Sequence, residues 1–112
     1  IENNYSLGNN CNSAGGINLY HSNANMDSVI IKNNHGGPAL ALSFGSYILN
    51  NLTISDNEGH GIVGSSMENL IVSQAIISGN TRRGIVLGGN CASEHLVYLS
   101  NMNINTNNYG VL

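Results

Sequence analysis

Apolar and polar residues alternate over short stretches of the chain, and no stretch keeps the three- and four-residue spacing of an amphipathic helix. Such alternation predicts short strands with one buried face. One pattern, an apolar-x-apolar pair followed three residues later by Asn, recurs along the chain. It occurs as Val29-x-Ile31 to Asn34, Leu52-x-Ile54 to Asn57, Ala75-x-Ile77 to Asn80 and Met102-x-Ile104 to Asn107, with a weaker copy from Leu7 to Asn12.

Two further apolar pairs keep the same register in each repeat. One follows a Gly, as in Gly16-Ile17-Asn18-Leu19, Gly61-Ile62-Val63-Gly64, Gly84-Ile85-Val86-Leu87 and Gly110-Val111. The other precedes the Asn-linked pair, as in Ala24 and Met26, Tyr47 and Leu49, Leu70 and Val72, and Val97 and Leu99. In the second repeat the spacing favours Ala39 and Ala41 as the inward residues, whereas side-chain size favours Leu40 and Leu42.

Three short strands in a repeat of about 23 residues cannot bury an apolar face alone, but stacked repeats can. Stacking places equivalent residues ~4.8 Å apart in parallel sheets and lines the interior with apolar columns. The sequence therefore predicts an all-β fold, a right-handed parallel β-helix of about four and a half coils with three short strands per coil. Residues 1–112 form one such segment, which we expect to be part of a longer chain.

The recurring asparagines predict an asparagine ladder at one corner of every coil. Stacked amides donate and accept hydrogen bonds along the column and satisfy turn groups beside the core. A partial second polar column, just before the Asn-linked strand, supports the same register; it consists of Ser28, Asn51, Gln74 and Asn101. The expected members of the ladder are Asn12, Asn34, Asn57, Asn80 and Asn107.

The Gly-Ile-x-Leu strand and the Asn-bearing corner resemble the parallel β-helix repeats of the pectin-lyase-like superfamily. The resemblance covers practically the whole chain. That superfamily includes polysaccharide lyases and hydrolases, phage tailspikes, periplasmic NosD-like proteins and extracellular β-helix regions of the fibrocystin type. The resemblance implies the fold but not the function, because the superfamily contains enzymes and non-enzymes.

Composition excludes some classes of function. Only 8% of the residues are charged, and three basic residues with a net charge of −3 provide almost none of the charge that nucleic-acid binding requires. No apolar run approaches the length of a membrane span, so we expect no membrane span in this segment. Asn, Gly and Ser, poor helix formers, replace the missing charges.

The turns after the ladder asparagines contain the candidate chemistry. On consecutive coils they read Asn34-His35-Gly36-Gly37, Asn57-Glu58-Gly59-His60 and Asn80-Thr81-Arg82-Arg83. Stacking is expected to gather these side chains into one turn patch, which we define as His35, Asp56, Glu58, His60, Arg82 and Arg83.

The turn patch has several interpretations. The plainest is a solvated surface with a weak Glu58–Arg82 ion pair; the others are glycan or anion binding, and a metal site made by His35, Glu58 and His60. As a catalytic site, Glu58 or His60 would act as general acid or base, and Arg82 or Arg83 would stabilise an anionic intermediate. The acidic set of the superfamily's lyases is not found, and neither a resident metal nor a cofactor is expected.

Other residues give narrower expectations. Cys11 and Cys91 fall about three coils apart and should not be bonded to each other. The insertion Gly88–His95 interrupts the repeat and is a tolerated loop or a binding face.

Tyr47 is expected in the core, whereas Phe44, Tyr20 and Tyr98 fall at turns or outward positions and form no continuous strip. Of the sequons at Asn4 and Asn51, Asn51 is the better glycosylation acceptor.

Two functions follow as expectations. The first is a structural or interaction module outside the cell or at its surface, whose partners are flanking chain, other coils or copies at the open ends, and polysaccharide. The second is a segment of a carbohydrate-active enzyme, a lyase or hydrolase, with Glu58, His60 and Arg83 as the candidate catalytic residues. The first is preferred, which favours a segment without enzymatic activity; if the segment is an enzyme, we expect a polysaccharide lyase or a glycoside hydrolase.

Overall fold

The computed structural model describes residues 1–6, 14–88 and 96–111, and every regular element in these ranges is a strand. These ranges contain no helix long and apolar enough to cross a membrane. The strands, in chain order, are β1 (Ile17–Tyr20), β2 (Ala24–Asp27), β3 (Ile30–Lys32), β4 (Leu40–Ser43), β5 (Ser46–Asn50), β6 (Thr53–Ser55), β7 (Ile62–Ser65), β8 (Asn69–Ser78), β9 (Arg83–Gly88), β10 (Leu96–Asn105) and β11 (Tyr109–Val111).

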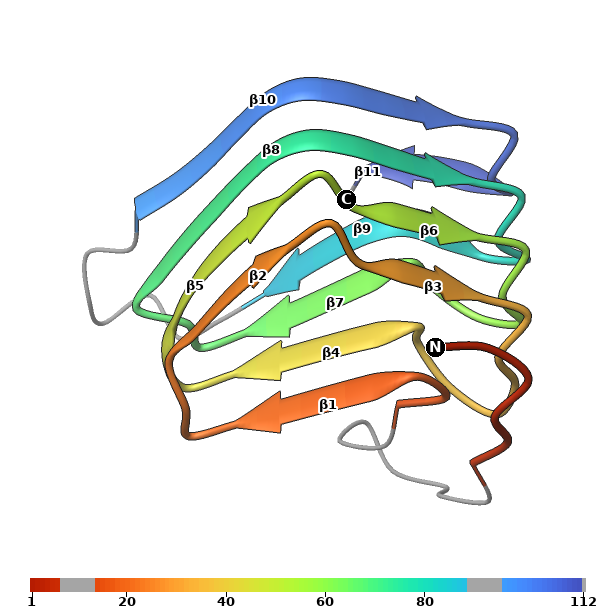
Figure 1. The fold of residues 1–112 in the computed structure, drawn as a ribbon, viewed down its shortest axis with the longest axis horizontal. Helices are drawn as coiled ribbons and strands as arrows, with labels where there is room; N and C mark the ends of the chain where they lie inside the picture. Colours follow the sequence, from red (N-terminus) through yellow and green to blue (C-terminus); the bar gives the residue numbers. More distant parts are fainter. Residues whose placement is uncertain (7–13, 89–95, 112) are drawn as a thin grey trace.

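The strands stack in two parallel sheets, one strand above another (Figure 1). One sheet has the order β1-β4-β7-β9-β11, and the other has the order β2-β5-β8-β6-β3 with β10 paired to β8. Each turn of the chain therefore adds one layer, which we call a coil. The first coil contains β1 to β3, the second β4 to β6, the third β7 and β8, and the fourth β9 and β10. The fold is a parallel β-helix of about four turns, which confirms the predicted class.

The strand count per coil differs from the prediction in the upper half of the stack. The first two coils have three short strands, but in the third and fourth coils the second and third strands run together as β8 and β10, each ten residues long. Gln74 and Asn101 bend these strands in the left-handed region, with φ of 55° and 50°. Ser28 and Asn51 adopt the same φ in the lower coils, so the second polar column marks a bend that every coil shares.

The expected apolar columns form the core. Ile54 pairs with Ile31 on one side and with Ile77 on the other, and Ile104 continues the column on Ile77. The side chains of Ile31, Ile54 and Ile77, on the first three coils, are fully buried, whereas Ile104 in β10 is partly exposed. Tyr47 is also fully buried, as predicted, and its hydroxyl donates to the carbonyl oxygens of Ser43 at 2.8 Å and Leu19 at 3.2 Å.

The register of the second repeat follows side-chain size. Leu40 pairs with Ile17 and Ile62, so the leucines of β4 occupy the apolar column. Ala39 takes the place that Gly occupies in the neighbouring coils. A Cβ at Gly16 would lie 2.5 Å from the carbonyl oxygen of Ala39, and one at Gly61 would lie 2.4 Å from that of Gly84. The Gly-Ile motif therefore reflects a close approach between adjacent coils.

Candidate functional site

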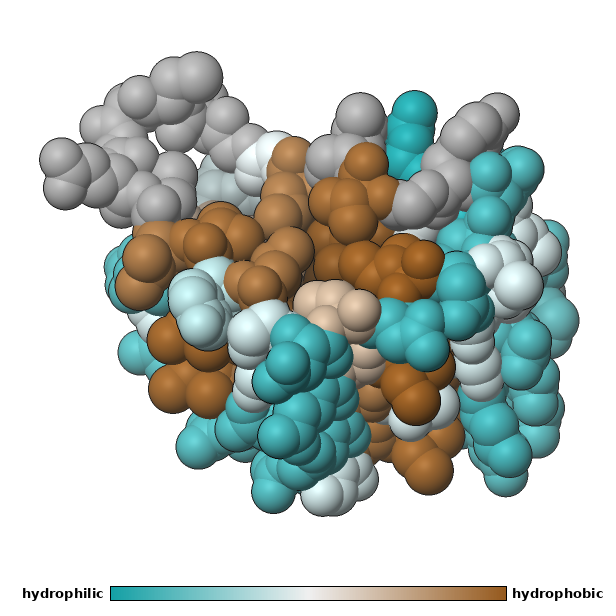
Figure 2. Space-filling model, turned by 90° about the horizontal axis from the view of Figure 1, so that it is seen from above, coloured by the Kyte–Doolittle hydropathy of each residue, from teal (hydrophilic) through white to brown (hydrophobic). Residues whose placement is uncertain are grey.

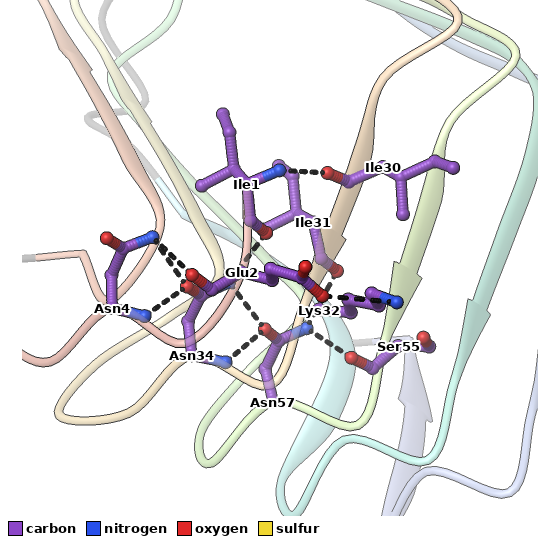
Figure 3. Close-up of polar contacts among 9 residues, drawn as sticks. All are labelled: Ile1, Glu2, Asn4, Ile30, Ile31, Lys32, Asn34, Ser55 and Asn57. Carbon is purple, nitrogen blue, oxygen red and sulfur yellow. Dashed lines mark hydrogen bonds and ion pairs between the residues drawn. The ribbon is translucent and has the colours of Figure 1, made fainter.

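Four ladder asparagines are joined by side-chain hydrogen bonds that all run in one direction. The Nδ2 of Asn34 donates to the Oδ1 of Asn57 at 3.0 Å (Figure 3). The same bond joins Asn57 to Asn80 at 2.9 Å and Asn80 to Asn107 at 2.8 Å. Asn34, Asn57 and Asn80 are buried, so the predicted ladder lies at the edge of the core.

Each amide also satisfies backbone groups. The Oδ1 of Asn57 accepts the backbone N–H of Asn34 at 3.0 Å, and the Nδ2 of Asn57 donates to the carbonyl of Ile31 in the coil below at 3.2 Å. Asn80 and Asn107 repeat both contacts one coil further along. Because a buried backbone group without a partner costs about 1–3 kcal/mol, the ladder is required to close the turn.

Asn4 joins the ladder, although the sequence did not predict it as a member. Both its backbone N–H and its Nδ2 donate to the Asn34 Oδ1 at 3.0 Å (Figure 3). The chain between Asn4 and Asn34 is 30 residues long, compared with the 23 residues between Asn34 and Asn57. Counting back by the regular repeat therefore gave Asn12, which itself lies outside the described residues.

The turn patch contains one close pair of side chains. The Nδ1 of His35 lies 2.8 Å from the Oε2 of Glu58 on the next coil, with about half of the His35 side chain and more of the Glu58 side chain exposed. Glu58 is thus paired with His35 and forms no ion pair with Arg82, which corrects the predicted surface pair. The backbone explains the choice, because the N–H of Glu58 donates to the carbonyl of Asn34 and so places Glu58 directly above His35.

His60 lies beside the two arginines of the next coil. The Nδ1 of His60 accepts the backbone N–H of Arg83 at 3.2 Å. Burial lowers the pKa of the His60 imidazole below its usual 6.5, because burial disfavours the charged form. The positive charges of Arg82 and Arg83 lower this pKa further. This environment favours the neutral imidazole, in which Nδ1 is free to accept the Arg83 N–H.

The side chain of Asp56 points towards Gly79 and away from the other residues of the turn patch. It adopts a left-handed backbone with φ of 57°, and its carboxylate lies over Gly79, where an added Cβ would come within 2.3 Å of the Asp56 Oδ1. Nowhere in the described parts of the chain do three or more His, Cys, Asp or Glu side chains form a group that could hold a metal ion. The alternative metal site of His35, Glu58 and His60 is therefore not formed.

A cluster of aromatic rings at another corner escaped the sequence analysis. We call Tyr20, His21 and Phe44 the ring cluster. The rings of His21 and Phe44 are stacked, with centroids 4.6 Å apart and an interplanar angle of 6°. Tyr20 stands edge-on to both, with centroids 4.5 Å from His21 and 5.5 Å from Phe44. All three rings are exposed.

The position of the ring cluster explains why it was missed. His21 and Phe44 follow β1 and β4, 23 residues apart, so one stacks on the other only once the coils are superposed. The pattern of the chain predicts Phe44 and Tyr20 at turns or outward positions, and the imidazole of His21 is not one of the five Tyr and one Phe side chains that were compared. The sequence does contain a sign of this stack, because the spacing of 23 residues places the rings of His21 and Phe44 at the same corner of two consecutive coils.

Several expectations concern residues that the structure leaves undescribed. Cys11, Cys91 and residues 89–95 of the insertion lie outside the described ranges. Of the two sequons, Asn4 is committed to the ladder, whereas Asn51 is exposed and its Nδ2 donates to the Oδ1 of Asp27 at 2.7 Å. The surface position expected for Asn51 is therefore confirmed.

The comparisons with known proteins identify no relative. No known protein family, no curated protein and no solved structure matches the chain.

Proposed function

We propose that this chain is a structural or interaction module outside the cell or at its surface, in which a rigid stack of coils presents turns to partners. The resemblance to the pectin-lyase-like superfamily is part of this proposal. The observation that carries it is the unbroken ladder from Asn4 to Asn107, in which every coil is hydrogen-bonded to the next at the same atoms.

A continuous ladder favours a rigid stack to which further coils can be added. Each bond between coils is the same, so the free energy of unfolding is approximately the sum of the stabilities of the coils and of the interfaces between them, as in other solenoids. The fourth coil presents the outer edge of β10, whose described pairing is to β8 alone. Figure 2 shows apolar side chains gathered across that end of the stack, with polar residues around the sides.

Further coils, of this chain or of another copy, are the partners that this end favours. An unpaired strand edge beside an apolar surface invites another strand. A further coil would continue the ladder in the same direction, because each Asn Nδ2 donates to the Asn of the following coil. Polysaccharide is the second proposed partner, bound at turns.

Light scattering and electron microscopy of the purified chain over a concentration series test the scaffold. We expect rods that lengthen in steps of one stack as the concentration rises. Discrete particles of fixed size at every concentration would contradict assembly through the ends. A polysaccharide-binding screen at the turns would then decide whether any interaction role remains.

A second function, a carbohydrate-active enzyme segment, is favoured by the contact between His35 and Glu58. A carboxylate 2.8 Å from an imidazole can exchange a proton, and Arg82 and Arg83 follow on the next coil. Under this proposal the substrate is an anionic polysaccharide that the guanidinium groups orient.

Cleavage assays with Glu58→Ala and Arg83→Ala test the enzyme proposal. Both substitutions should abolish release of oligosaccharides from polysaccharides if the turn patch is catalytic, and Asn25→Ala, an exposed residue on β2, should leave it intact. Cleavage that survives both substitutions would exclude the turn patch. Absence of cleavage by the unmodified chain would exclude the second function.

A further inference from the structure

Among the described residues, the corner that bears the ring cluster carries aromatic rings on the first two coils and none on the third. His21, Phe44 and Ser66 are equivalent residues, because Tyr20 pairs with Ser43 and Ser43 pairs with Ser65 immediately before them. His21 covers one face of the Phe44 ring. The other face is directed towards the third coil, where the equivalent residue is Ser66, whose short side chain carries no third ring.

The backbone at this corner is unfavourable for an aromatic residue. Phe44 has φ of 51°, in the left-handed region, and it is the one apolar side chain among the positive-φ residues other than glycine in the described ranges. A bulky residue in this region is uncommon and costs of order 1–3 kcal/mol. Phe44 nevertheless remains 43% exposed, so burial returns only part of that cost.

Polar side chains follow Phe44 and Ser66 closely in the chain at this corner. Glu68 lies two residues after Ser66 on the same coil; its backbone N–H donates to the carbonyl of Gly45, and its Oε2 accepts the Ser46 hydroxyl at 3.3 Å. The Oε1 of Glu68 has no partner among the described residues. The hydroxyls of Ser43 and Ser65 are hydrogen-bonded to each other at 3.0 Å on the adjacent position of both coils.

We propose that this corner binds a neutral sugar ring, which continues the stack on the face of Phe44 that is turned away from His21. The apolar face of a pyranose matches the aromatic face, Tyr20 forms a side wall, and Glu68 accepts hydrogen bonds from sugar hydroxyls as a charged acceptor. The carboxylate disfavours uronic acids by repulsion. This inference rests on the proposed role as an interaction module and names the partner and its site.

Isothermal titration calorimetry of the complete chain tests the site with four probes. These are the β-1,4-linked hexasaccharides of glucose, mannose and xylose, and the hexamer of galacturonic acid. We expect at least one neutral hexasaccharide to bind and the galacturonate hexamer to bind more weakly. Phe44→Ala should weaken that binding by about tenfold or more, and Glu68→Gln should weaken it by a smaller factor.

Two variants serve as matched controls. Tyr98→Ala removes a ring that is 57% exposed on β10, away from the ring cluster, and should change the affinity by less than about twofold. Phe44→Tyr keeps the ring and should retain binding, which separates loss of the platform from loss of the fold. Circular dichroism of each variant accompanies the titration.

Each outcome bears on the inference. Sugar binding that Phe44→Ala leaves unchanged would overturn this site without affecting a glycan-binding scaffold. Binding of none of the neutral sugars, tighter binding of galacturonate, or a Phe44-dependent dimer in sedimentation without sugar would overturn the neutral-sugar assignment. The microscopy of rods is independent of all these results, so failure of the scaffold and failure of the sugar site are distinguishable.

Discussion

At the ladder corner consecutive coils carry the same side chain, whereas at the ring-cluster corner they carry His21, Phe44 and Ser66. The amides of Asn34, Asn57 and Asn80 are buried, and each is bonded to the coils on both sides. The ring cluster is exposed, and its contacts end at Phe44. A corner that must satisfy buried backbone groups repeats one residue type, and a corner open to solvent is free to vary and to bind a partner.

The core behind both corners should respond most strongly to substitution. Ile54→Asp places an unpaired charge where the side chain is 0% exposed, and we expect it to cost at least about 4 kcal/mol and to prevent folding. Thr53→Asp, on the opposite face of β6, should be tolerated. Far-UV circular dichroism during thermal unfolding compares the two, and the reverse order would mean that the register is wrong by one residue.

The ladder corner should be next in sensitivity. Asn57→Ala removes the oxygen that accepts the backbone N–H and the Nδ2 of Asn34, and it removes the Nδ2 that donates to Asn80 and to the carbonyl of Ile31. We expect a loss of about 3 kcal/mol or more in the free energy of unfolding, measured in urea. Asn25→Ala, an exposed outward residue of β2, should cost less than about 0.5 kcal/mol. Equal effects for the two asparagines would contradict a structural ladder.

The ring cluster should contribute little to stability. Phe44→Ala removes the stack on His21 and should cost no more than about 1.5 kcal/mol. Phe44→Gly removes the same ring but relieves the positive φ of 51°, so we expect it to be more stable than Phe44→Ala by about 1 kcal/mol. Urea unfolding of both variants provides the measurement. A loss as large as that of Asn57→Ala would show that the ring cluster is part of the structural core.

The smallest expected effect is the pH dependence caused by His60. Because its pKa in the folded chain lies below the 6.5 of the unfolded chain, the unfolded state binds more protons between the two values. Stability is therefore complete above pH 6.5 and falls as the pH drops through the lowered pKa. NMR titration of the imidazole should give a midpoint below 6.5, and Arg82→Ala should raise it. A midpoint at or above 6.5 would contradict this environment.

The repeat determined a large part of the fold. The spacing of Ile31, Ile54 and Ile77 predicted one buried column, and the following asparagines predicted the ladder, because a period of about 23 residues leaves equivalent side chains in contact. Periodicity identifies neighbours only while the spacing is regular. Asn4 and Asn34 are 30 residues apart, so the same counting does not identify Asn4 as a member of the ladder.

The tertiary structure alone decided contacts between side chains on different coils. Pairing of Leu40 with Ile17 and Ile62 settled the register of the second repeat. The partner of Glu58 is His35 rather than Arg82, and His21 lies on Phe44. The sequence by itself determined which faces are buried, because burial follows the local alternation of apolar and polar residues. The functional corners depend on which coil lies above which, and on the direction that each turn gives its side chain, and these are set only when the whole stack has formed.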